Sequence, residues 1–207
     1  MEGRMRRFLA LGDSYTIGEG VDPADRWPSQ LHASFTASGI EIAEPEIIAQ
    51  TGWATDDLLA AIKAQDPTGP YDLVSLLIGV NNQYQGRLIG EYRAQFRKLV
   101  DAALKLAGGR PKRLLILSIP DWGVTPYAEG RDRAMIATQV DKFNDVSRKE
   151  AAERWARYVD ITGVSRKHGA LPEYLTGDGL HPSGRMYAEW ARLVEPEALK
   201  GIGIATG

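Results

Sequence analysis

Short runs of apolar residues, each ended by glycine or polar turn residues, recur along the chain. Runs of this length between turn residues are typical of strands that are covered on both faces of a sheet. The pattern predicts five strands, near residues 8–12, 46–50, 71–79, 113–119 and 158–161. The run at 71–79 is almost unbroken in apolar residues and gives the clearest signal.

Between these strands, apolar positions recur at the three- and four-residue spacing of a helix. The predicted helices cover residues 27–39, a segment capped by Thr55, residues 91–106, a long segment that ends about Trp155, and a last helix that starts at Ser183. Residues 124–131 and most of 162–182 lack this spacing and are predicted to be loops.

Alternating strands and helices predict an α/β protein with a five-stranded parallel sheet and right-handed crossovers. The expected strand order is 2-1-3-4-5, which places the switch point between the first and third strands. In that order Ser14, after the first strand, lies next to Asn81, after the third. With 207 residues and no internal repeat, we expect one domain over residues 1–207.

The composition and charge of the chain exclude several classes of partner and site. A net charge of −2 without a basic stripe argues against nucleic acid as a partner. The absence of cysteine excludes disulfides and cysteine metal sites, and no stretch approaches a membrane span. The apolar run at 8–11 is too short for a signal peptide. A cytoplasmic protein is the simplest expectation, although a chain without cysteine fits other compartments too. Trp190 and the last helix suit either the core or a dimer face, which leaves a homodimer open.

Ser14 follows the first strand directly and is therefore a candidate nucleophile, although Gly-Asp-Ser is also ordinary turn and cap chemistry. A serine hydroxyl needs a base, and imidazole is the usual one near neutral pH. His181 has Asp178 three residues before it, a spacing that lets the carboxylate reach one ring nitrogen on a tight loop. His32 is predicted to be a partly exposed helix residue, and His168, with no carboxylate beside it, a surface residue.

Acyl transfer also needs N–H donors directed at the developing oxyanion. Gly52 and Asn81 each follow a predicted strand at the same edge of the sheet as Ser14. The candidate donors are the backbone N–H groups of Ser14 and Gly52 and the side-chain amide of Asn81. Each residue has an ordinary alternative role in a turn or a cap, but their joint placement at one edge favours a catalytic site.

Four segments, Gly12-Asp13-Ser14, Gly52, Gly79-Val80-Asn81 and Asp178-Gly-Leu-His181, together resemble the four-block pattern of the SGNH (GDSL) hydrolases. The resemblance extends from residue 8 to about 195. It implies a flavodoxin-like three-layer α/β/α fold and a serine esterase or lipase that needs no metal or cofactor.

The resemblance also implies roles for single residues. Ser14 is the nucleophile, His181 the base and Asp178 the acid that orients it, while Ser14, Gly52 and Asn81 supply the oxyanion donors. The sequence departs from the family pattern at Tyr15, where the family name has leucine, and at Asn82, where many members carry aspartate. The departure at Tyr15 is a variation that the family tolerates, and the departure at Asn82 leaves the detail of the pocket open but not the chemistry.

The residues that we assign to a substrate pocket lie in or beside loops at this edge: Asp13, Trp53, Asn82, Tyr84, Trp122 and Leu180, with Tyr127 beside them. Each aromatic residue has the alternative role of packing a loop onto the domain. Because no insertion is long enough to form a lid, short acyl esters are the expected small-molecule substrates. An acetyl ester on a carbohydrate fits equally well.

Three other functions remain open. A flavin-binding electron carrier of the same architecture would use residues 14–18 as a phosphate loop, but it leaves Asp178 and His181 without a role. A non-catalytic acyl- or glycan-binding module would keep the shape of the site without turnover. A metal hydrolase is the poorest fit, because Asp178 and His181 offer only two ligands.

Overall fold

The computed structural model describes residues 4–204, so the two ends of the predicted domain lie outside the described residues. Five parallel strands form one sheet in the order β2-β1-β3-β4-β5. The strands are β1 (Phe8–Gly12), β2 (Glu46–Ala49), β3 (Leu73–Leu77), β4 (Leu114–Leu117) and β5 (Arg157–Val159). The predicted α/β fold and strand order are confirmed.

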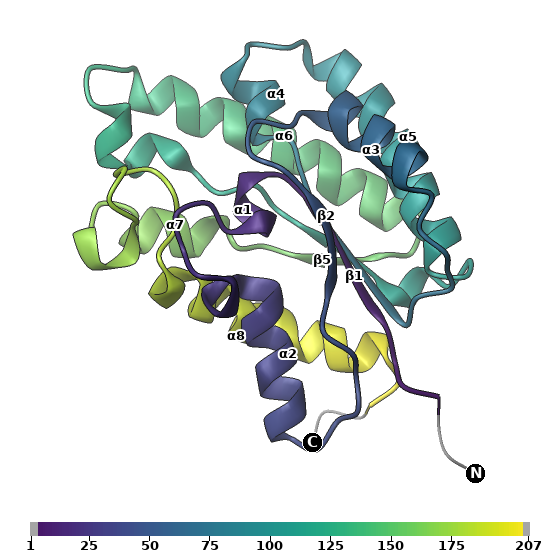
Figure 1. Ribbon diagram of the computed structural model, residues 1–207. Helices are drawn as coiled ribbons and strands as arrows, with labels where there is room; N and C mark the ends of the chain where they lie inside the picture. The colour runs from purple at the N-terminus through teal and green to yellow at the C-terminus, as the bar shows by residue number, and fades with distance from the viewer. Residues whose placement is uncertain (1–3, 205–207) are drawn as a thin grey trace.

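Helices cover both faces of the sheet (Figure 1). On one face lie α2 (Trp27–Ala37) and α8 (Gly184–Gly201), and on the other lie α3 (Thr55–Gln65), α5 (Ile89–Leu106) and α6 (Arg133–Glu153). Every residue of β1, β3 and β4 is therefore buried, whereas the edge strands β2 and β5 are partly exposed. Burial on both faces explains why the central strands are apolar without alternation.

Three short helices were not predicted. They are α1 (Ser14–Ile17), α4 (Val80–Tyr84) and α7 (Thr162–His168), the last within the segment expected to be mostly loop. Single 3-10 turns also lie at Pro23–Asp25, Pro111–Arg113, Trp122–Val124, Pro126–Ala128 and Pro172–Tyr174. A helix of two turns or fewer is too short to show the apolar spacing on which the prediction rests.

The predicted cap of α3 was wrong by one residue. Ala54 occupies the cap position, and its N–H donates to Asp57 Oδ2 at 2.9 Å, while Thr55 is the first helical residue. Thr55 instead turns its hydroxyl to the side chain of Gln95 on α5. Its side chain therefore joins two helices rather than closing the end of one.

The structure shows how far Trp190, His32 and His168 are buried. Trp190 is fully buried against Tyr187, so it belongs to the core of its own chain. His32 is partly exposed, as predicted. The prediction for His168 was wrong: its ring stacks on Tyr174 at 4.1 Å, and Nε2 lies 3.4 Å from Glu189 Oε2, a carboxylate contributed by α8.

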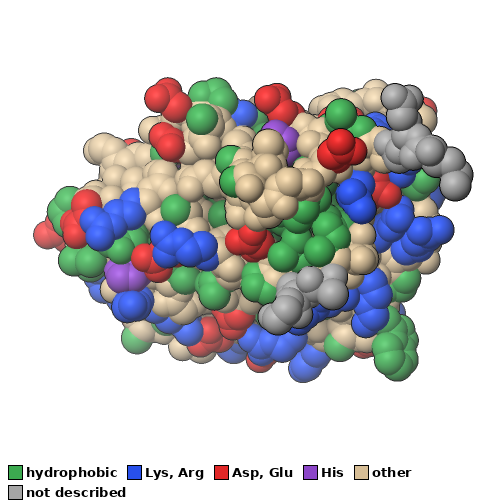
Figure 2. Space-filling model, turned by 90° about the horizontal axis from the view of Figure 1, so that it is seen from below, with side chains coloured by type: hydrophobic (Ala, Val, Ile, Leu, Met, Phe, Trp, Pro, Cys, Tyr) green, Lys and Arg blue, Asp and Glu red, His purple; other side chains and the backbone are tan. Residues whose placement is uncertain are grey.

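Charged groups of both signs are interspersed on the face seen from below in Figure 2, with apolar side chains between them. None of the helices described in residues 4–204 is long and apolar enough to cross a membrane.

Candidate active site

The first part of the site lies where β1 ends. The carboxyl ends of the strands point toward α1 and α4 (Figure 1), and the chain turns at Asp13 so that Ser14 is the first residue of α1. Asp13 Oδ1 accepts the N–H of Tyr15 at 3.0 Å and so caps this helix. Glycine is required at position 12, because a Cβ there would lie 2.1 Å from Thr16 Oγ1 and 2.6 Å from the carbonyl oxygen of Leu77.

The segment after β2 contributes a tight turn. Trp53 N–H donates to Gln50 O at 3.3 Å, and Gly52 has φ of +85°, a backbone conformation that favours glycine. Within the described residues, the N–H groups of Gly52 and Ser14 donate to no acceptor. Two backbone donors are thus left for a ligand.

The segment after β3 is α4, and it is fastened to this turn. Asn81 Nδ2 donates to Trp53 O at 2.8 Å. An amide nitrogen carries two hydrogens, and in the described chain the second one has no acceptor. This bond holds the Asn81 amide and the Gly52 turn in a fixed relation to each other.

The last part of the site is the loop before α8. His181 Nδ1 and Asp178 Oδ2 are 2.6 Å apart. The other carboxylate oxygen, Oδ1, accepts the backbone N–H of Leu180 at 2.9 Å and that of His181 at 3.0 Å. It also accepts the Thr176 hydroxyl at 2.7 Å. Partial burial alone would raise the pKa of Asp178, but the hydrogen bonds from His181, Thr176 and Leu180 outweigh burial and hold that pKa well below its usual range. The carboxylate therefore stays ionised and fixes the imidazole with Nδ1–H toward it.

One cavity of about 200 Å³ brings these parts together. Its lining includes Ser14, Gly52, Asn81 and His181, together with Tyr15, Thr51, Val80, Tyr84, Trp122, Tyr127 and Leu180. Ser14 Oγ and His181 Nε2 have no hydrogen-bond partner among the described residues. In unliganded active sites, catalytic hydrogen bonds are often long or poorly aligned, so the missing contact does not exclude the predicted roles of the two residues.

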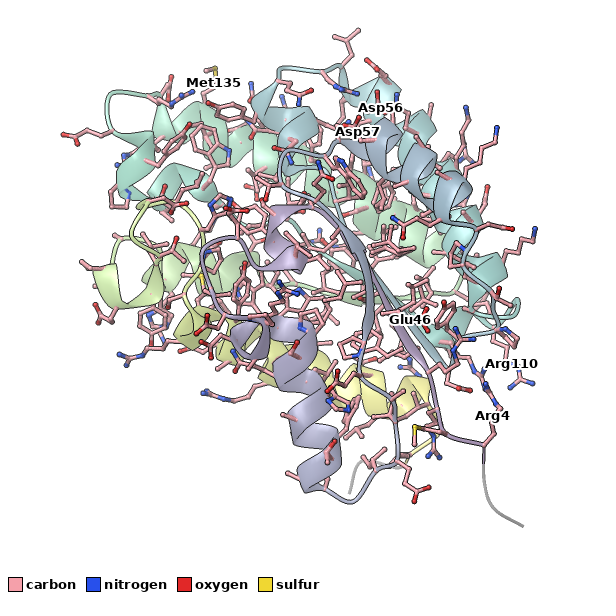
Figure 3. All side chains as sticks on the ribbon, viewed as in Figure 1. Arg4, Glu46, Asp56, Asp57, Arg110 and Met135 are labelled. Carbon is pink, nitrogen blue, oxygen red and sulfur yellow. The ribbon has the colours of Figure 1, made fainter. Side chains whose placement is uncertain are left out.

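Labelled side chains in Figure 3 show the orientation of the sheet. Asp56 and Asp57, at the start of α3, and Met135, at the start of α6, lie on the upper side of that view. Glu46, the first residue of β2, and Arg4 lie on the lower right, at the amino ends of the strands. The cavity is thus at the edge of the sheet where ligands of open α/β folds bind.

Three residues predicted for the pocket do not line the cavity. Asn82 is fully buried, with Oδ1 accepting Thr55 N–H at 3.1 Å and Nδ2 donating to Thr55 Oγ1 at 2.7 Å. Trp53 contributes its carbonyl oxygen to Asn81, and Asp13 is buried below the surface. Tyr84, Trp122, Tyr127 and Leu180, which the sequence analysis named at this edge, line the cavity. Tyr15, Thr51 and Val80 line it as well and were not assigned to the pocket, because their only sequence signal is adjacency to a motif residue.

Tyr15 packs against the His181 ring. Its ring lies 5.6 Å from the His181 ring and 6.0 Å from that of Trp190, so it packs the imidazole against the core below α8. The residue that differs from the leucine of the family name therefore occupies a buried position with a defined contact. It is 3% exposed.

Asp13 titrates in an unusual range. Its carboxyl group is fully buried, and this burial raises its pKa to about 7 despite the N–H of Tyr15 that favours the charged form. Oδ2 has no hydrogen-bond partner among the described residues. In the unfolded chain an aspartate titrates near a pKa of about 3.9.

We expect Asp13 to make the protein less stable as pH rises. Between about pH 4 and pH 7 the folded state holds a proton on Asp13 that the unfolded state has released, so the free energy of unfolding falls across this window. Asp13→Asn, which does not titrate, should flatten this dependence. Urea unfolding of both proteins at pH 5 and pH 8 measures it, and equal pH slopes would contradict the prediction.

Comparison with known proteins identifies the family. Residues 10–189 match the model of the GDSL-like lipase/acylhydrolase family. No curated protein matches the sequence.

Solved structures agree in fold. The crystal structure of TesA is 20% identical, with a TM-score of 0.72 over 95% of this chain and 99% of that one. The lipase/acylhydrolase from Enterococcus faecalis is also 20% identical, with a TM-score of 0.72 over 95% and 96% of the two chains. Axe2, an acetylxylan esterase from Geobacillus stearothermophilus, is 20% identical, with a TM-score of 0.66 over 97% and 95%. The chain belongs to the GDSL-like lipase/acylhydrolase family and is an enzyme of its esterase/acylhydrolase type.

Proposed function

We propose that the protein is a serine hydrolase that cleaves carboxylic esters with short acyl chains through an acyl-enzyme. The observation that carries this proposal is the lining of one cavity. The backbone N–H groups of Ser14 and Gly52, which donate to no acceptor among residues 4–204, line it with the second amide hydrogen of Asn81. The Ser14 hydroxyl lines it too, as does the imidazole of His181, which a carboxylate holds. A nucleophile, an oriented base and an oxyanion site are the parts that ester hydrolysis requires.

The reaction follows from these positions. Ser14 Oγ attacks the ester carbonyl carbon while His181 Nε2 takes its proton, and the ionised Asp178 stabilises the imidazolium. The three N–H donors stabilise the oxyanion until it collapses and expels the alcohol, which takes the proton from His181. Water then attacks the acyl carbon, with His181 again as base, and the carboxylic acid leaves with Ser14 restored.

The size of the cavity supports the preference for short acyl groups. About 200 Å³ is less than the ~300–1,000 Å³ of pockets that enclose a drug-sized ligand. A preference for p-nitrophenyl esters of ten or more acyl carbons over acetate or butyrate would contradict it.

A carbohydrate O-acetylesterase with the same chemistry is the second candidate. Three aromatic rings, those of Tyr84, Trp122 and Tyr127, line the cavity wall, and aromatic faces are suited to stacking on a sugar. The structural similarity to an acetylxylan esterase is consistent with this substrate class. The single domain of residues 1–207 and the cytoplasmic location stay predictions.

Labelling with a fluorophosphonate, read by intact mass and peptide mapping, tests the proposal. One adduct on Ser14, together with hydrolysis of p-nitrophenyl acetate, is the expected result. A folded protein that takes no adduct and hydrolyses no ester would instead favour the non-catalytic acyl- or glycan-binding module. Comparing p-nitrophenyl acetate with acetylated xylo-oligosaccharides then separates the two substrate classes.

Two adjacent asparagines offer a matched test of the oxyanion site. Asn81→Ala removes the proposed donor and should lower kcat by about 10²–10³-fold. Asn82→Ala leaves the buried N–H of Thr55 without an acceptor and should lower the free energy of unfolding by about 1–3 kcal/mol, with kcat changed less than about tenfold. Ester hydrolysis and urea unfolding of both variants separate the effects. A near-unchanged kcat in Asn81→Ala removes that residue from the role.

A further inference from the structure

Two tyrosines from different segments meet at the wall of the cavity. Tyr84 is the last residue of α4, and Tyr127 lies in the 3-10 turn after β4. Their hydroxyl oxygens are 3.1 Å apart, and we call this pair the tyrosine bridge. Both residues line the cavity, and at 45% and 43% exposed each is also in contact with solvent.

The tyrosine bridge joins two sides of the candidate active site. Tyr84 lies one helical turn after Asn81 on α4, so the two side chains share a face of that helix. On the other side, the N–H of Tyr127 donates to Gly179 O at 3.1 Å, within the loop that carries His181. The bridge therefore runs from the segment with the candidate amide donor to the segment with the imidazole.

Hydrogen bonds hold the rings behind the bridge in place. The Trp122 ring lies edge-on to Tyr84 and Tyr127, with centroids 5.4 and 6.2 Å away. Trp122 Nε1 donates to Gln83 Oε1 at 2.7 Å, and Gln83 Nε2 donates to Gln139 Oε1 of α6, also at 2.7 Å. These bonds anchor the aromatic wall to α6.

Arg131 fastens the wall from outside the cavity. Its guanidinium carbon lies 5.2, 5.3 and 5.6 Å from the ring centroids of Tyr84, Trp122 and Tyr127, and one nitrogen donates to the Tyr84 hydroxyl at 3.2 Å. A ring of the bridge can swing outward only by breaking the bond between the hydroxyls and the cation–π contacts. The wall is therefore preorganised rather than adaptable.

We propose that the tyrosine bridge determines specificity by setting the maximum length of the acyl group that the cavity accepts. This inference rests on the proposed function. The acyl group is the part that stays bound on Ser14 while water enters, so it is the part that the cavity beside Ser14 has to hold, whereas the alcohol must leave to solvent. A longer acyl chain meets the rings of Tyr84 and Tyr127 on the cavity wall, and removing either ring makes room for it at that point.

The test compares acyl chains of two lengths on one alcohol. In Tyr84→Ala and in Tyr127→Ala, the ratio of kcat/KM for p-nitrophenyl octanoate to that for acetate should rise on the order of tenfold above the wild-type ratio. Tyr84→Phe keeps the ring and loses the bond between the hydroxyls, so its ratio should rise less. Trp155→Ala is the matched control, because it removes an aromatic side chain that is 74% exposed beyond the far end of α6, about 30 Å from the start of that helix.

Each outcome has one meaning. Thermal melting first establishes that the variants fold, and because the two tyrosines lie on separate segments, either alanine variant suffices. A folded variant with the wild-type ratio overturns the role of the bridge and leaves the proposed function intact. A variant that changes the preference among acetate esters of different alcohols, but not the acyl ratio, also overturns it. A wild-type protein that hydrolyses no ester contradicts the proposed function itself, and the inference with it.

Discussion

Ser14→Ala is expected to lower kcat for p-nitrophenyl acetate by about 10⁴–10⁶-fold while the protein keeps its fold. The substitution removes one oxygen atom, which is the proposed nucleophile. Stability should change little, since the hydroxyl makes no hydrogen bond within the described residues. The backbone N–H of residue 14 stays in place, so the oxyanion donors survive the substitution.

The measurement combines initial rates with thermal melting and fluorophosphonate labelling. Ser29→Ala is a matched control, because it removes a hydroxyl from α2 on the other side of the molecule from α4. The control should label and turn over like wild type. A Ser14→Ala protein that keeps activity within tenfold, or that still takes the label at another residue, would show that the nucleophile is elsewhere.

Asp178→Asn is expected to lower kcat by about 10⁴-fold. Asp178 Oδ2 accepts the Nδ1–H of His181, which leaves Nε2 free to take the proton of Ser14. An amide at this position presents an N–H to Nδ1 and so favours the tautomer with the proton on Nε2. That tautomer cannot act as the base. The Oδ1 bonds to the backbone N–H groups of Leu180 and His181 can persist, which keeps the loop in shape.

The pH dependence separates this effect from a structural one. The pKa of Asp178 is held below its value in the unfolded chain, so the stability it contributes is present above about pH 4 and is lost as pH falls through the lower folded value. Throughout pH 5–9 the carboxylate is ionised, and the loss of kcat in Asp178→Asn should persist across that range. Asp145→Asn, at a surface carboxylate paired with Arg148, is the control. A kcat for Asp178→Asn within tenfold of wild type would contradict the tautomer argument.

The sheet could be predicted from the sequence because a strand that is buried on both faces is a continuous run of apolar residues. β1, β3 and β4 are covered on both faces, so each is an uninterrupted apolar run, and the topology rules for parallel strands supplied their order. The short helices show no such sequence pattern. In α7, for example, two of seven residues are buried, too few to show a period.

For Asn81 and Asn82, the sequence does not predict which of the two side chains faces the cavity. Successive residues of a helix point about 100° apart, so one of the pair can face the cavity while the other points away from it. In a helix of five residues the sequence does not reveal which one, and the structure directs Asn81 to the cavity wall and Asn82 to Thr55.

Contacts between residues far apart in the sequence also could not be predicted from the local sequence pattern. His168 has no carboxylate beside it in the sequence, and the structure supplies Glu189 from the next helix. Asp13 is assigned to the substrate pocket from the sequence, but the fold buries it completely, and this burial raises its pKa. In each case the environment is made by segments that come together only in the fold.

The order of the site along the chain has a consequence for synthesis. Ser14 comes after the first strand, whereas His181 comes after the last, just before the final helix. On the proposed function, a nascent chain or an N-terminal fragment carries the nucleophile for most of its length without the base that activates it. Ester hydrolysis is therefore expected to begin only after the segment with Asp178 and His181 has been made, when all five strands are already present.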